Sequence, residues 1–151
     1  MLDVDGVLNS NSSKAYSPDG FIGIPDKYVK RLKKIVDATG AKVVLSSDWK
    51  MASQKDYHYL TNKLWFKGGI SIYSQTPNIR RAMRGTEIRE WLKEHDDVEA
   101  FVVLDDEFFS DYITYESNKI DIAEHLIWTD PDKGLTEDDV RVAIEILNEG
   151  I

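Results

Sequence analysis

The chain has 151 residues, of which 42% are hydrophobic and 30% are charged, and its formal net charge is −8. This length and composition are typical of one globular domain, so we expect residues 1–151 to form a single cytoplasmic domain. The negative charge disfavours a broad nucleic-acid-binding surface. The lack of a long apolar run disfavours a membrane span or signal peptide. The lack of cysteine excludes disulfides and thiol catalysis.

The first residues carry two carboxylates, Asp3 and Asp5, directly followed by Gly6. Alternate side chains of an extended segment share a face, so both carboxylates project the same way, and the glycine permits a tight turn beside them. Two like charges this close need compensation, and Mg²⁺ is a cation that prefers carboxylate and phosphate oxygens. The alternative is an ordinary Asp-rich loop after a short strand.

The strand before Asp3 is unusually short, because only Met1 and Leu2 precede it. A typical strand has five or six residues. Either further residues precede Met1, which is the hypothesis that we favour, or a stub strand holds Asp3 poorly.

The middle of the chain alternates polar and apolar segments. Residues 9–23 are rich in Ser, Asn and Gly and predict a long loop, which is often functional at this length. A helix is expected from Asp26 to Gly40, followed by a buried strand at residues 41–45. Residues 51–79 are harder to interpret and suggest a helix followed by a short strand. Their aromatic side chains could stack on a base, although ordinary packing is the preferred interpretation.

The second half of the chain is more regular. Helical spacing predicts a helix at residues 86–94, and two apolar runs predict strands at residues 101–104 and 126–128. Thr136 should cap a last helix together with Asp139. Strands and helices in alternation indicate an α/β fold with a mostly parallel central sheet flanked by helices.

Polar clusters follow three of the predicted strands. In parallel α/β sheets, ligands bind outside the carboxyl ends of the strands. The clusters that lie at this end are Asp3 with Asp5, Ser46 with Ser47, and Asp105 with Asp106. We therefore expect a functional site at this rim, with Asp111 as either a supporting carboxylate or an exposed loop residue.

Four motifs occur in order along the chain: Asp3-x-Asp5-Gly6, a strand that ends at Ser46, a basic residue that opens a helix, and Asp105-Asp106. Their residues and order resemble the motifs of the haloacid dehalogenase (HAD) superfamily of phosphohydrolases. Segments 84–92 and 129–136 resemble a small capless branch that includes the HAD domains of multidomain RNA-repair proteins. The resemblance implies a three-layer Rossmann-like fold without a large cap domain.

The resemblance also implies a Mg²⁺-dependent phosphomonoesterase. Asp3 would be the nucleophile that forms an aspartyl-phosphate, and Asp5 the general acid and then base. Ser46, or alternatively Ser47, would bind a phosphoryl oxygen. The substrate would be a phosphorylated nucleotide, a nucleic-acid end or another phosphomonoester.

Charge neutralisation in this family requires a cation and a metal ion. Arg84 would neutralise the phosphoryl group, with Arg81 and Lys67 as alternatives. Mg²⁺ would be held by Asp3, by the backbone carbonyl of Asp5 and by Asp106, with Asp105 in support.

Two other classes of function share some of these residues. A receiver-type phosphoacceptor domain also uses an acid pair, Ser or Thr, a basic residue and Mg²⁺, but its phosphoacceptor lies on the third strand, which disfavours it here. A catalytically idle HAD fold used for binding is the second alternative, and the short first strand keeps it open.

Overall fold

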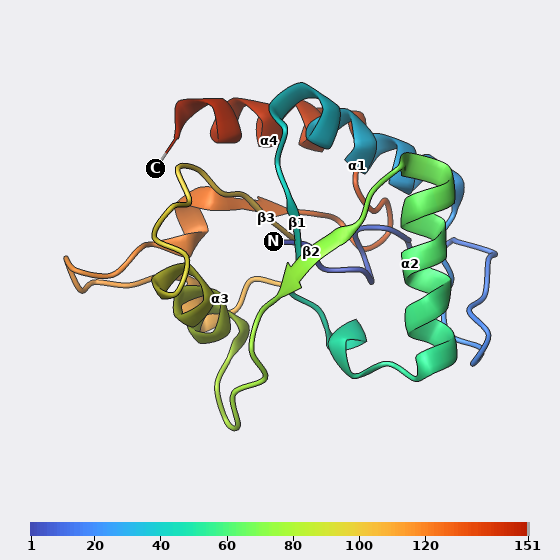
Figure 1. The fold of residues 1–151 in the computed structure, drawn as a ribbon, viewed down its shortest axis with the longest axis horizontal. Coiled ribbons are helices and arrows are strands. Elements are labelled where there is room, and N and C mark those ends of the chain that lie inside the picture. Colours follow the sequence, from blue (N-terminus) through green and yellow to red (C-terminus); the bar gives the residue numbers. More distant parts are fainter. Residues whose placement is uncertain (151) are drawn as a thin grey trace.

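The computed structural model describes residues 1–150, and its centre is a set of short parallel strands. Two parallel pairs form, β1 with β2 and β3 with β4. The strands span Val43–Leu45 (β1), Ile72–Gln75 (β2), Val103–Asp105 (β3) and Leu126–Trp128 (β4). Figure 1 shows the N-terminus between the two pairs, in the middle of the molecule.

The first residues join the two strand pairs. Leu2 forms parallel bridges to Leu45 on one side and to Leu104 on the other. The Leu2 amide donates to the Val44 carbonyl at 2.8 Å, and the Asp3 amide donates to the Leu104 carbonyl at 2.9 Å. Hydrogen bonds thus hold this short segment on both sides, so the alternative in which Asp3 is poorly held is wrong.

Four α-helices accompany the strands. They span Asp26–Thr39 (α1), Gln54–Gly68 (α2), Arg84–Lys93 (α3) and Glu137–Glu149 (α4). Helix α1 ends at Gly40, whose φ of 70° is the left-handed conformation that favours glycine at a helix end. Helix α4 begins with the predicted reciprocal hydrogen bonds between Thr136 and Asp139. None of the helices in residues 1–150 combines the length and apolar character needed to span a lipid bilayer.

Alternate strand residues belong to two different hydrophobic clusters. Leu45 and Leu104 pack in the cluster that also contains buried side chains of α1, α2 and α4. Val44 and Val103 pack with the buried side chains of α3 instead. This division follows from the alternation of side chains along a strand. In Figure 1, α1 and α4 lie on one side of the strands and α3 on the other.

The predicted α/β class with parallel strands is confirmed. The ambiguous residues 51–79 contain α2 and β2, as suggested. Helix α3 begins at Arg84, two residues before the predicted start at Thr86, which places Arg84 in its first turn. The three-layer Rossmann-like arrangement, the lack of a large cap and the single-domain boundary at 1–151 stay predictions.

Candidate active site

Three carboxylates converge at the carboxyl ends of the central strands. Asp3 follows Leu2 directly, while Asp105 ends β3 and is followed by Asp106. One carboxylate oxygen from each of the three residues lies within 4.8 Å of the others. Asp3 and Asp105 are buried and Asp106 is partly exposed, so the cluster opens to solvent on one side.

A tight turn after Asp5 brings the first motif against Asp106. Gly6 has a φ of 77°, and a Cβ atom added there would lie 2.3 Å from Asp106 Oδ2. Thr129 fixes the turn from β4 by donating its hydroxyl to the Gly6 carbonyl at 2.7 Å. Glycine is therefore required at this position both by conformation and by the close approach of the acid.

Two donors hold the exposed carboxylate of Asp5. Asn9 Nδ2 donates to Asp5 Oδ1 at 2.9 Å, and the buried Trp49 donates its indole N–H to Asp5 Oδ2 at 3.1 Å. Asn9 also accepts the Gly6 amide at 2.8 Å, so it joins Asp5 to the turn. Sequence reasoning did not assign roles to Asn9, which begins the predicted loop 9–23, or to Trp49, which follows the Ser46 and Ser47 pair.

Arg84 is the cation that contacts the acid cluster. Its Nη1 lies 2.8 Å from Asp105 Oδ2 and 3.4 Å from Asp3 Oδ2. Its Nη2 lies 3.4 Å from the exposed Asp48, and the guanidinium lies over the Phe109 ring at 4.8 Å. These contacts spread one positive charge over several acids and leave the cluster with an excess of negative charge.

Asp111 fixes the start of the helix that carries Arg84. It accepts the backbone amides of Gly85 at 3.1 Å and Thr86 at 2.7 Å, and also the Thr86 hydroxyl. Arg89, one turn further along α3, donates to the Asp111 and Ile120 carbonyls. Asp111 is thus a helix-capping carboxylate that positions Arg84, which favours the supporting role over the exposed-loop alternative.

The electrostatic environment of the acids is unfavourable to their charged forms. Burial and the neighbouring Asp105 raise the pKa of Asp3 to about 8, although Arg84 opposes this shift. Burial and Asp105 also raise the pKa of Asp106. Because carboxylate oxygens this close repel each other, a hard divalent cation would relieve the repulsion, and the donor set fits Mg²⁺.

Both candidate serines lie at the end of β1. Ser46 is buried, and its hydroxyl has no hydrogen-bond partner within residues 1–150. Ser47 Oγ accepts the Trp49 amide at 3.2 Å, and Ser47 lines a pocket next to Arg84. Both serines are buried, and both stay candidates for binding a phosphoryl oxygen.

The alternative cations lie elsewhere. Lys67 is on α2 and forms an ion pair with Asp26 at 3.5 Å. Arg81 has a left-handed φ of 65° in the loop that precedes α3. Within residues 1–150, neither forms an ion pair with Asp3, Asp105 or Asp106, so the geometry favours Arg84.

Comparison with known proteins identifies the family of the chain. The family model of the HAD domain in Swiss Army Knife RNA repair proteins matches residues 1–140. The chain therefore belongs to this family of small HAD domains. No curated protein and no solved structure matches the chain.

Proposed function

We propose that this HAD domain is a Mg²⁺-dependent phosphomonoesterase that acts through an aspartyl-phosphate on Asp3. The observation that carries the proposal is the grouping of the Asp3, Asp105 and Asp106 carboxylates within 4.8 Å, with Arg84 3.4 Å from Asp3. Membership of the HAD family supports the same chemistry.

In the first half-reaction, a carboxylate oxygen of Asp3 attacks the phosphorus atom and the bond from phosphorus to the leaving oxygen breaks. Asp5 donates its proton to that leaving oxygen. The hydrogen bonds from Asn9 and Trp49 orient the Asp5 carboxyl for this transfer. Arg84 and one of the two serines bind non-bridging oxygens of the phosphoryl group.

In the second half-reaction, Asp5 takes a proton from a water molecule, and the water oxygen attacks the phosphorus atom of the aspartyl-phosphate. The bond between phosphorus and the Asp3 oxygen breaks, which releases inorganic phosphate and restores the carboxylate. Splitting one displacement into two steps in this way is the general advantage of a covalent nucleophile.

Mg²⁺ would be held by Asp3, by Asp106 and by the Asp5 backbone carbonyl, with Asp105 orienting the set. Asp105 is suited to that supporting role because it already accepts hydrogen bonds from Arg84, Tyr112 and the Glu107 amide. When bound, the ion would neutralise phosphoryl charge. The substrate class that we propose is a nucleotide or a nucleic-acid end, which rests on the description of the family alone.

The test is hydrolysis of p-nitrophenyl phosphate by the wild type, with Mg²⁺ and with EDTA, alongside Asp3→Asn. We expect Mg²⁺-dependent turnover that falls at least about a thousandfold in Asp3→Asn, in line with the loss of other covalent nucleophiles. Asp37→Asn is a matched control, because Asp37 is an exposed helix residue paired with Lys33. Absence of turnover in folded wild type would contradict the proposal and favour an idle binding module, whereas a long-lived phosphoprotein would favour a phosphoacceptor domain.

A further inference from the structure

A pocket of about 570 Å³ adjoins the acid cluster. It lies between the short 3₁₀ helix Asp48–Met51, the loop of residues 76–83 and the segment that follows β3. Its inner end includes Ser47 and Arg84, and Arg84 is 3.4 Å from the proposed nucleophile Asp3. The volume is within the range of pockets that hold small ligands. A substrate whose phosphate lies at Asp3 therefore has room for its remaining part here.

The middle of this pocket presents apolar side chains to solvent. Met51 is 78% exposed and Met83 is 50% exposed, although both line the pocket. Phe109 lies on the same pocket and stacks with the Arg84 guanidinium. Thioether and aromatic side chains bind flat aromatic rings well. This wall therefore suits the planar, uncharged part of a ligand.

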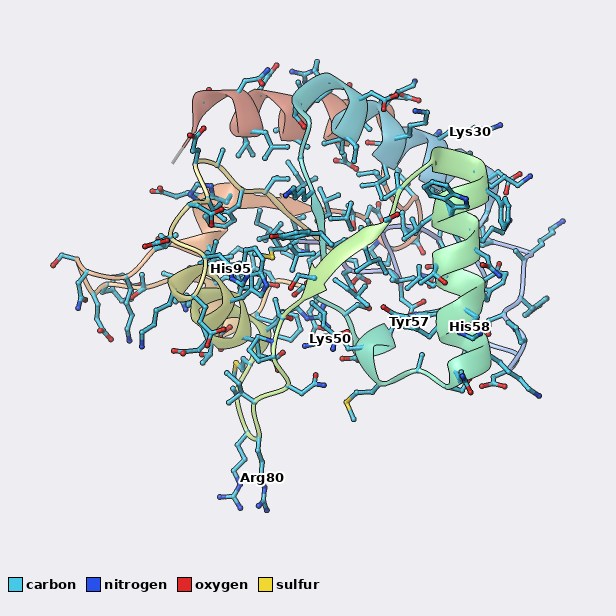
Figure 2. The ribbon with its side chains drawn as sticks, in the orientation of Figure 1. Lys30, Lys50, Tyr57, His58, Arg80 and His95 are labelled. Carbon is cyan, nitrogen blue, oxygen red and sulfur yellow. The ribbon has the colours of Figure 1, made fainter. Side chains whose placement is uncertain are left out.

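Lys50 and Glu87 make the wall rigid. The Lys50 ammonium donates to the Thr76 carbonyl and hydroxyl, to the Pro77 carbonyl and to Glu87 at 3.4 Å. The other Glu87 oxygen accepts the Ile79 amide at 2.9 Å. Lys50 is labelled beside this loop in Figure 2. Because its donors already have partners, Lys50 fixes the loop and is not a free cation for a ligand.

The outer end of the pocket is basic. Arg80 lines the pocket, and Figure 2 shows its side chain at the tip of the loop, pointing away from the rest of the molecule. The pocket also contains three acids: Asp48 faces Arg84, Glu87 faces Lys50, and Glu107, in the segment that follows β3, is exposed. In a chain with a net charge of −8, an exposed arginine beyond an apolar wall favours a second anionic group on the ligand.

We propose that this pocket binds the leaving group of a nucleoside phosphate that carries a second phosphate, with the base against Met51 and Met83 and the second phosphate at Arg80. This inference rests on the proposed function, because it places the first phosphate at Asp3. A free nucleoside bisphosphate and the phosphorylated end of an oligonucleotide both have this chemistry.

The test measures equilibrium binding by calorimetry to Asp3→Asn protein with Mg²⁺, so that it does not depend on turnover. The ligands are adenosine 3′,5′-bisphosphate and adenosine 3′-phosphate. We expect the second phosphate to tighten binding about fivefold, the upper range for one exposed ion pair. Adding Arg80→Gln should remove this difference, whereas Arg141→Gln, on the exposed face of α4 with Glu145, should keep it. Equal affinity for the two ligands, or equal effects of the two arginine variants, would overturn the proposal.

Two further arms address the base and the source of the ligand. Met51→Ala should weaken binding of both adenosine ligands about threefold, because a few exposed apolar contacts with the base are lost. Binding of ribose 5-phosphate, which has no base, should stay unchanged. An equal effect on all three ligands would overturn the placement of the base.

A 3′-phosphorylated dinucleotide distinguishes the two sources of the ligand. Tighter binding of the dinucleotide than of the bisphosphate would indicate an oligonucleotide end, and the reverse order would indicate a free nucleotide. If the wild type hydrolyses p-nitrophenyl phosphate but these ligands bind with equal affinity, only the pocket proposal is overturned. If the ligands bind selectively but the wild type shows no turnover, only the phosphatase chemistry is contradicted.

Discussion

The acids of two regions of the molecule have pKa values shifted in opposite directions, although each region contains a cation. At the rim, Arg84 contacts Asp3 and Asp105, which are buried, and Asp106 lies beside them partly exposed. Burial and the neighbouring Asp105 raise the pKa values of Asp3 and Asp106. On the helical surface, Asp26 accepts Lys63 at 2.7 Å and has Lys67 at 3.5 Å. Contact with Lys63 lowers the pKa of Asp26.

The difference lies in the ratio of charges and in access to water. A surface acid with two lysines is compensated, and solvent screens what remains. Three acids with one arginine are not compensated, and burial increases the penalty. The rim therefore disfavours the charged forms of its acids, and an added cation would favour them. This contrast can be tested at several points.

Removing Arg84 should give the largest effect. Arg84→Met takes the ion-pairing cation from the cluster and from the proposed phosphoryl site, so we expect phosphatase activity to fall roughly 100- to 1000-fold, the usual cost of one electrostatic contact to the transition state. Arg84→Lys should recover only part of the activity, because an ammonium cannot span two acids as a guanidinium does. The measurement is kcat/KM with p-nitrophenyl phosphate. Wild-type activity in Arg84→Met would show that another cation serves the site.

Displacing Asp106 from the cluster should also be costly. Gly6→Ala puts a Cβ atom 2.3 Å from Asp106 Oδ2 at a residue with a φ of 77°. We expect a loss of about 3 kcal/mol in the free energy of unfolding, from overpacking and strain together, measured by urea denaturation. Gly20→Ala is the matched control, because Gly20 has a φ of 88° and open space around it. An equal loss in both variants would mean that strain alone matters and that contact with Asp106 does not.

The acids of the rim could be predicted from the sequence because they come at the ends of strands. The motif Asp3-x-Asp5-Gly6 and the pair Asp105-Asp106 each come directly after an apolar segment, and parallel strands bring such ends together. The stub strand was harder to judge, because its stability comes from hydrogen bonds to Val44 and Leu104, more than 40 residues away in the chain.

The residues that position the site could not be predicted in this way. Helix α3 begins at Arg84, two residues before the start that the sequence predicts. Its N-terminus is capped by Asp111, about 25 residues downstream, because Met83 makes no side-chain cap. Trp49 contacts Asp5 because the 3₁₀ helix Asp48–Met51 lies beside the first loop, which the sequence does not reveal. Helix α2 was ambiguous because Trp65 and Phe66 are exposed, which blurs the apolar pattern that marks a helix.

Adding a divalent cation should stabilise the rim and leave the helical surface unchanged. With Mg²⁺ at 100 times its dissociation constant, we expect about 2.7 kcal/mol of extra stability, or a rise in Tm of roughly 5–10 °C. The rise should disappear in Asp106→Asn and persist in Asp26→Asn, and EDTA should reverse it. The readout is thermal unfolding followed by circular dichroism. A rise of the same size in Asp106→Asn would place the ion elsewhere.

The raised pKa of Asp3 gives a pH dependence with a definite sign. In the folded protein without divalent cations this carboxyl keeps its proton up to about pH 8, whereas its ordinary pKa is 3.8. Between these values the folded state holds the extra proton, so raising the pH should lower the free energy of unfolding by up to about 1.4 kcal/mol per pH unit.

The check is urea denaturation in EDTA at pH 5, 6, 7 and 8. Asp3→Asn should show a shallower decline than the wild type over this range, because asparagine does not titrate. Asp37→Asn, at an exposed ion pair on α1, should follow the wild type. Parallel curves for the wild type and Asp3→Asn would show that Asp3 is ionised in the folded protein throughout.

The surface acids should give the smallest effect. Asp26→Asn removes the acceptor of Lys63 and Lys67, yet Asp26 is solvated and its ion pairs are screened, so we expect a loss of only about 0.5 kcal/mol. The sign with pH is opposite to that of Asp3: because contact with Lys63 lowers the pKa of Asp26, its small contribution is present at neutral pH and is lost as the pH falls through the folded-state pKa. Adding 0.5 M NaCl should shrink the difference between Asp26→Asn and the wild type further, since salt screens exposed charges most. If instead Asp26→Asn cost as much as Gly6→Ala, the surface pairs would be structural anchors for α1 and α2, and the contrast between the two acidic regions would fail.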